Sequence, residues 1–216
     1  MVRGYVISRE GLDSALTAES LERGGVKTEV IESFGRTWVD MLRHVTTEVL
    51  SKEESALVVR AGAELLSEFS GQWAQHVEDG MLCAPTLVSP ESSTTELTNN
   101  LASGFPELRY GMGVFDPRKG PEIVNCFDHG AVGLPLHVVK DVGNFDPNLK
   151  EFFGIVDYCV RSRWHGYQSY LLHDVPMRVA FDTFSVGHGE EAALMLMDST
   201  SFERKYGGAI LSNLSH

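Results

Sequence analysis

The amino-acid sequence predicts a mainly α-helical fold: a bundle of about six helices with one irregular segment, residues 104–147, that has room for short strands. Two long stretches place apolar residues at spacings of three and four, the repeat of an amphipathic helix. Two segments begin with a serine followed three residues later by glutamate, the pattern of a capping box. Seven glycines and five prolines fall within residues 104–147, too many for a long helix.

Length and composition indicate one domain over residues 1–216 in a reducing compartment. Hydrophobic residues make up 43% of the chain, enough for a core. No apolar run reaches the roughly 18 residues of a membrane helix, and no secretory signal is visible. The three cysteines, Cys83, Cys126 and Cys159, are odd in number and widely spaced, so we expect buried thiols. These observations predict a cytoplasmic protein with no membrane partner.

The N-terminal part is predicted to be a short helix over residues 8–23 and then an antiparallel helical hairpin over residues 26–80. The first hairpin helix has an apolar stripe of Val26, Val30, Phe34, Trp38, Leu42, Val45 and Val49. The second has Leu57, Ala61, Leu65, Phe69, Trp73 and Val77 at a strict spacing of four. Aromatic residues on such stripes are usually buried, so Trp38 and Trp73 are predicted core residues.

The middle of the chain is predicted to be mostly irregular. A short helix begins at a capping box at Ser93 and ends at Gly104. Within residues 104–147 short extended pieces are expected at 123–124 and 136–139. A segment of this length without regular structure is unusual, so we expect it to pack on the helices or to form contacts between subunits.

The C-terminal part is predicted to be helical over residues 147–206. Asp146-Pro147 is a typical helix start, and the apolar spacing continues to about residue 172. After a break at Asp174-Val175-Pro176, a second helix is expected over residues 175–184. A third is expected over residues 190–206, ending at two glycines.

Several catalytic and ligand-binding motifs are absent from the sequence, which contains no phosphate-loop, dinucleotide-binding, GxSxG or HExxH pattern. No catalytic residue, metal site or cofactor is therefore assigned. One alternative uses His129 and His137 in the glycine-rich segment as a ligand or haem site of a helical sensor domain, since residues 129–135 resemble the segment around the haem-binding histidine of sensor globins. A second alternative is an enzyme of unrecognised type.

Arginines, histidines and aromatic residues are concentrated in residues 161–184. Asp182 lies among apolar neighbours, and a carboxylate in such surroundings usually has a partner, because an isolated buried charge is costly. A salt bridge from Asp182 to Arg161 or Arg163 is therefore predicted between two packed helices.

Ala180-Phe181-Asp182, with Phe184 in an aromatic position, resembles a motif in the coat proteins of flexible filamentous plant viruses. The helix from Glu190 is similar to the helix that follows the motif in that family. The resemblance implies a non-enzymatic, self-assembling coat or nucleocapsid protein of the virion that holds single-stranded RNA in a groove. The residues that it assigns to RNA binding are Arg161, Arg163, Arg178, Phe181 and Asp182.

The charge of the chain does not suit this leading hypothesis well. The formal net charge is −12, which opposes a broad basic surface for nucleic acid. A local arginine pocket in the C-terminal half remains compatible with this net charge. The expected partners are therefore other copies of the chain and single-stranded RNA.

Overall fold

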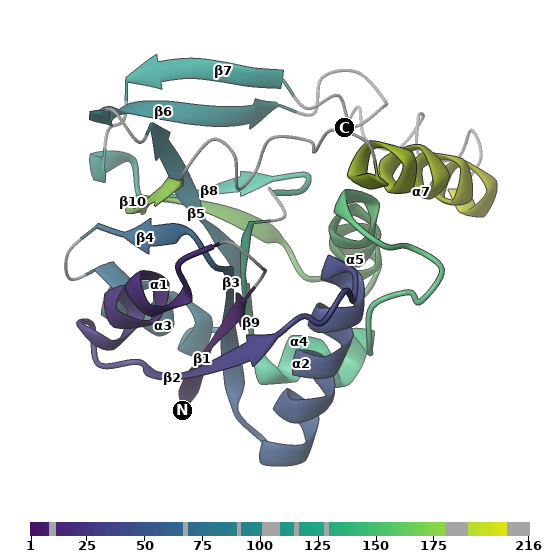
Figure 1. Cartoon of the computed structure of the whole chain (residues 1–216), viewed down its shortest axis with the longest axis horizontal. Coiled ribbons are helices and arrows are strands. Elements are labelled where there is room, and N and C mark those ends of the chain that lie inside the picture. Colours follow the sequence, from purple (N-terminus) through teal and green to yellow (C-terminus); the bar gives the residue numbers. More distant parts are fainter. Residues whose placement is uncertain are drawn as a thin grey trace.

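The protein has an α/β fold built around one mixed β-sheet, as the computed structural model shows (Figure 1). The structure describes residues 1–8, 12–66, 69–89, 92–100, 109–114, 117–127, 130–179 and 190–206. Ten strands belong to the sheet, and the main path has the order β2-β1-β3-β9-β5-β10-β4. The predicted mainly α-helical bundle is therefore wrong.

The first half of the sheet is a parallel unit. Its elements are β1 (Val2–Ser8), α1 (Ser14–Glu22), β2 (Lys27–Glu32), α2 (Trp38–Lys52) and β3 (Ser55–Arg60). β1 pairs in parallel with β2 on one side and with β3 on the other. β1 and β3 are buried almost throughout, as expected for parallel strands covered on both faces. β2 forms one end of the main path, and its Lys27 and Glu29 are exposed.

The second half of the sheet is mixed. Its elements are β4 (Ala63–Leu65), α3 (Phe69–Glu78), β5 (Leu82–Ser89), β8 (Pro121–Val124), β9 (Ala131–Leu134), α4 (Leu136–Val142), α5 (Phe152–Trp164) and β10 (Ser169–Val179). β9 runs antiparallel to β3, and β10 runs parallel to β5. A hairpin of β6 (Ser92–Asn100) and β7 (Arg109–Val114) extends from β5, and a short 3₁₀ turn, η1 (Pro117–Lys119), precedes β8.

Helices cover both faces of the sheet (Figure 1). α1 and α3 lie on one face over a core that includes Leu21 and Trp73. α2, α4 and α5 lie on the other face over a second core. α7 (Glu190–Tyr206) packs outside α5, where Phe202 contacts Phe153 with ring centroids 5.3 Å apart. None of the described helices is both long and apolar enough to cross a bilayer.

The predicted hairpin over residues 26–80 is replaced by β2, α2, β3, β4 and α3. The first apolar stripe is helical from Trp38 onward, whereas Val30 lies in β2 and Phe34 is 85% exposed in the following loop. Leu57 and Leu65, spaced as on a helix, lie instead in β3 and β4. Continuous apolar runs fit buried strands as well as buried helices, and periodicity alone does not separate them.

The predictions for the middle and the C-terminal part are confirmed only in places. β8 includes the extended piece at 123–124, but residues 136–139 are helical. The helix expected from Ser93 is β6. The helix expected over residues 147–172 is α5, which ends at Trp164, and residues 175–179 lie in β10. α7 matches the predicted 190–206. Trp38, Trp73 and the three cysteines are buried, as predicted.

Candidate functional site

The order of the strands reverses between β1 and β3. The chain passes from β1 outward to β2 and then back across β1 to β3, so α1 and α2 lie on opposite faces. In open α/β sheets, ligands bind beyond the carboxyl ends of the strands at such a switch point. Here β1 ends at Ser8 and β3 ends at Arg60, and the Ala61 N–H donates to the Ile7 carbonyl at 3.0 Å. A ligand-binding site is therefore expected at this edge of the sheet.

Five residues form a connected group at this edge, and we call them the switch-point cluster. They are Trp38, Arg60, Lys150, Glu151 and Asp198. Arg60 Nη2 donates to Glu151 Oε2 at 2.6 Å, with the two side chains 10% and 13% exposed. The guanidinium carbon of Arg60 lies 4.6 Å from the ring centroid of Trp38. The result is a cation on an aromatic face, held by the Glu151 carboxylate, with both side chains largely shielded from water.

The N-terminus of α2 holds the same carboxylate. Because α2 follows β2, its first turn lies at the carboxyl edge. The backbone N–H of Trp38 donates to Glu151 Oε1 at 3.2 Å, and that of Val39 donates to the Lys150 carbonyl at 3.0 Å. Thr37 and Asp40 complete a capping box. Glu151 thus occupies the position that an anion takes at a helix N-terminus, between the backbone N–H group and a guanidinium.

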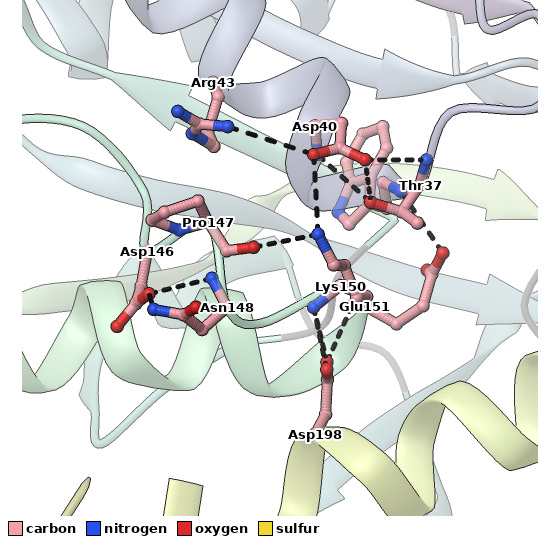
Figure 2. Close-up of polar contacts among 10 residues, drawn as sticks. Thr37, Asp40, Arg43, Asp146, Pro147, Asn148, Lys150, Glu151 and Asp198 are labelled. Atoms are coloured by element: carbon pink, nitrogen blue, oxygen red, sulfur yellow. Dashed lines mark hydrogen bonds and ion pairs between the residues drawn. The ribbon is translucent and has the colours of Figure 1, made fainter. Parts of the chain in front are cut away.

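Asp198 connects this group to α7. Its carboxylate accepts hydrogen bonds from the backbone N–H groups of Lys150, at 2.8 Å, and Glu151, at 2.7 Å, and so holds the two residues that precede α5 (Figure 2). Asp198 is almost fully buried, and this burial raises the pKa of its carboxyl group, although the two backbone N–H groups oppose the shift. The position of Glu151 is therefore fixed from three elements, α2, α5 and α7.

Phe34 is an exposed aromatic residue beside the switch point. The Ser33 N–H donates to the Ser8 carbonyl at 3.1 Å, which attaches the loop after β2 to the end of β1. Phe34 has φ +47° and is 85% exposed. A positive φ is uncommon outside glycine and is found often at functional positions. An open ring therefore lies in the loop that leads from β2 to Trp38 of the cluster.

The arginines predicted to bind RNA are not brought together. Arg161 and Arg163 lie in the last turn of α5, whereas Arg178 lies near the end of β10, at the other edge of the sheet. Arg161 donates to Asp157 at 2.8 Å, and Arg163 donates to Asn125 at 2.8 Å. Arg178 donates to Glu64 at 3.0 Å. These contacts are made within the protein itself.

Three other predicted site residues, Phe181, Asp182 and His129, lie outside the described residues, so the salt bridge to Asp182 stays a prediction. His137 lies on α4, at the edge of the sheet opposite the switch point, with an exposed ring 5.4 Å from that of Tyr167. An exposed ring differs from the enclosed apolar pocket that haem needs.

Sequence reasoning missed Arg60 and Glu151. Both residues fall within predicted helices, Arg60 in the hairpin over residues 26–80 and Glu151 in the helix that begins at Asp146-Pro147. A signal was present, because Arg60 directly follows the apolar run 56–59 and precedes Ala61-Gly62. A charged residue at the end of a buried strand, before a glycine turn, is typical of a site at a sheet edge. Without the correct strand assignment, that signal had no meaning.

No protein-family model matches the chain, and no curated protein matches it. Solved structures do match in fold. GalNAc-T7 with UDP, GalNAc and Mn2+ gives a TM-score of 0.57 at 11% identity, covering 83% of this chain and 44% of that chain. A197 from STIV gives a TM-score of 0.53 at 11% identity, covering 82% of this chain and 84% of that chain. TarS 1–349 of S. aureus in complex with UDP gives a TM-score of 0.48 at 10% identity, covering 100% of this chain and 75% of that chain.

At these identities the comparisons show the fold alone, and the chain spans less than half of the GalNAc-T7 chain. The fold is one that glycosyltransferase enzymes use. The resemblance to filamentous virus coat proteins is wrong, as is the coat or nucleocapsid function derived from it, because the matching structures are of a different class. The short motif around Ala180 misled because common residues match by chance.

Proposed function

We propose that this protein belongs to the glycosyltransferase class and binds a nucleoside-diphosphate sugar at the switch-point cluster. The observation that carries the proposal is the position of the Glu151 carboxylate. It is held by the Arg60 guanidinium at 2.6 Å and by the first N–H of α2 at 3.2 Å, where the strand order reverses. Groups that bind a carboxylate in this way also suit a phosphate.

A second feature of the cluster favours a ligand rich in acceptors. Within the described residues, the buried indole N–H of Trp38 has no hydrogen-bond acceptor. A buried donor without an acceptor costs free energy, on the order of 1–3 kcal/mol. Arg60 lies against the same ring, so a diphosphate bound to the guanidinium would bring acceptor oxygens close to both groups. Phosphate oxygens are acceptors with no donor, which is the complement that these side chains require.

Phe34 is the residue that we assign to the nucleobase. Its ring is open to solvent beside the end of β1, one loop away from the cluster. An aromatic ring in this position offers a stacking surface to a planar base. The sugar would then lie beyond the diphosphate, on the far side from Phe34.

UDP is the first nucleotide to test, because the GalNAc-T7 structure, which matches with a TM-score of 0.57, was solved with UDP. Isothermal titration of the full chain with UDP should give saturable binding to one site. Phe34→Ala should weaken UDP binding by about threefold to tenfold, the loss expected for one aromatic contact. Binding of inorganic pyrophosphate, which has no base, should not change in that variant.

A matched control is Trp164→Ala. Trp164 is also a large exposed aromatic residue, 68% exposed, but it ends α5 at the opposite edge of the sheet. This variant should bind UDP as the wild type does. If neither UDP nor GDP nor ADP binds saturably to the folded wild-type protein, the proposal fails.

A further inference from the structure

We infer that the diphosphate binds at Arg60 without a divalent metal ion, with the guanidinium as the cation that neutralises it. This inference rests on the proposed function and specifies its chemistry. The matching structure of GalNAc-T7 holds Mn2+ together with UDP, so a metal is the obvious expectation for this fold. The described residues at the switch point do not fit that expectation.

A manganese ion needs several oxygen or imidazole ligands in one place. Across the part of the chain that the structure describes, no three His, Cys, Asp or Glu residues are grouped to hold a metal. β3 ends at Arg60 and is followed by Ala61-Gly62, so none of these three residues has a carboxylate. In the cluster, Glu151 binds Arg60 and the start of α2, and Asp198 binds the backbone at Lys150 and Glu151.

The residue at the end of β3, Arg60, carries a positive charge. A guanidinium keeps its proton at all ordinary pH values, so it repels a second cation nearby whatever the conditions. The same group binds phosphate oxygens in a planar, bidentate geometry. Arg60 is held on Trp38 and is 10% exposed at its side chain, so few rotamers remain to be lost when an anion binds.

Binding is then an exchange of anions at Arg60. In the free protein the Glu151 carboxylate occupies the guanidinium and the first N–H of α2. When the nucleotide enters, a phosphate takes the place of one carboxylate oxygen, and no bond is formed or broken covalently. Glu151 competes with the ligand, so the strength of the Arg60–Glu151 pair sets the affinity.

The first experiment compares UDP binding to the full chain in EDTA and in Mn2+. We expect the Kd to agree within about twofold in the two buffers, which is about 0.4 kcal/mol. UDP binding that requires Mn2+ overturns the inference and leaves the proposed function standing. No saturable binding of UDP, GDP or ADP in either buffer overturns both. The two failures are therefore distinguishable.

The second experiment uses two variants with opposite expected effects, both titrated in EDTA. Arg60→Gln should weaken UDP binding about tenfold or more, the loss of a charge-assisted contact to phosphate. Glu151→Gln should tighten UDP binding by about threefold or more. The uncharged glutamine competes less with phosphate for Arg60, so Arg60 is available to the ligand for a larger fraction of the time. A Glu151→Gln protein that binds more weakly than wild type contradicts the exchange.

Two further proteins keep this test decisive. Arg60→Gln leaves the Glu151 carboxylate buried and can unfold the protein, so the double variant Arg60→Gln with Glu151→Gln removes both charges together. It should fold and bind UDP as weakly as Arg60→Gln. Arg204→Gln removes an exposed arginine near the end of α7 and should bind as wild type does. A double variant that retains wild-type affinity overturns the role of Arg60.

Discussion

Asp157 joins three helices through one buried carboxylate. It lies within α5 with no exposed surface, and its oxygens accept from Arg161 Nε at 2.8 Å and Lys205 Nζ at 2.6 Å. Tyr206 also donates its hydroxyl to Asp157. Arg161 in turn donates to the carbonyls of Val142 and Asn144, at the end of α4. Burial, followed by the bond to Asp157, raises the pKa of Tyr206.

Asp157→Ala should destabilise the protein by about 3–5 kcal/mol, because removing one member of a buried charge network leaves its partners without compensation. Urea unfolding measures the change. Asp79→Ala is a suitable control, since Asp79 is exposed and bonds to Gln75; it should change stability by less than about 0.5 kcal/mol. Equal effects of the two variants would show that the network contributes nothing.

Asp198 makes stability depend on pH with a predictable sign. Burial raises its pKa above the ordinary value of 3.8, so between the unfolded and folded pKa values the folded protein binds more protons than the unfolded chain. Its contribution to the free energy of unfolding is therefore full at lower pH and falls as pH rises through the folded pKa.

The matched variant for this prediction is Asp198→Asn, which does not titrate. The free energy of unfolding of the wild type minus that of the variant should decrease as pH increases from about 4 toward neutrality. Taking the difference cancels titrations elsewhere in the chain. A difference that stays constant or increases over this range would contradict the raised pKa.

At the scale of elements, the start of α5 and the start of α2 approach each other closely at Gly154 and Val39. A Cβ on Gly154 would lie 2.2 Å from Cγ2 of Val39, which is fully buried. Ala is ordinarily favoured over Gly inside a helix by about 1 kcal/mol. Overpacking costs about 1–3 kcal/mol, so packing should outweigh propensity here.

Gly154→Ala should therefore destabilise the protein, although helix propensity alone predicts the reverse. Adding Val39→Ala removes the clashing methyl groups, and the double variant should be more stable than the sum of the two single changes by about 1 kcal/mol or more. Chemical unfolding of all four proteins completes the cycle. Additive effects of the two substitutions would mean that positions 39 and 154 are not energetically coupled and would contradict the predicted clash.

The sequence predicts helices better than strands in this chain. α7 and α2, which begins at Trp38, were both predicted to be helical. β1 and β3 were missed because strands buried on both faces lack the alternation that marks a half-exposed strand. The spacing of Leu57 and Leu65 matched a helix by coincidence.

At the scale of the whole molecule, the candidate site depends on contacts that no local pattern records. Arg60 and Glu151 are 91 residues apart in the chain, and Glu151 is 47 residues from Asp198. Their meeting follows from the strand order and from the packing of α7 on α5, which a single sequence does not specify. The burial of Trp38 and of the cysteines was predictable because it depends on residue type alone.

β2, at one end of the main sheet path, bears on how copies of the protein meet. An edge strand presents unpaired backbone N–H and C=O groups that can pair with a strand of another molecule, including a second copy of the same protein. Lys27, Glu29 and Glu32 are exposed on this strand. They discourage the stacking of strands into aggregates. Replacing them with apolar residues beside Val30 and Ile31 would leave a short β-branched, uncharged segment, the composition from which amyloid grows.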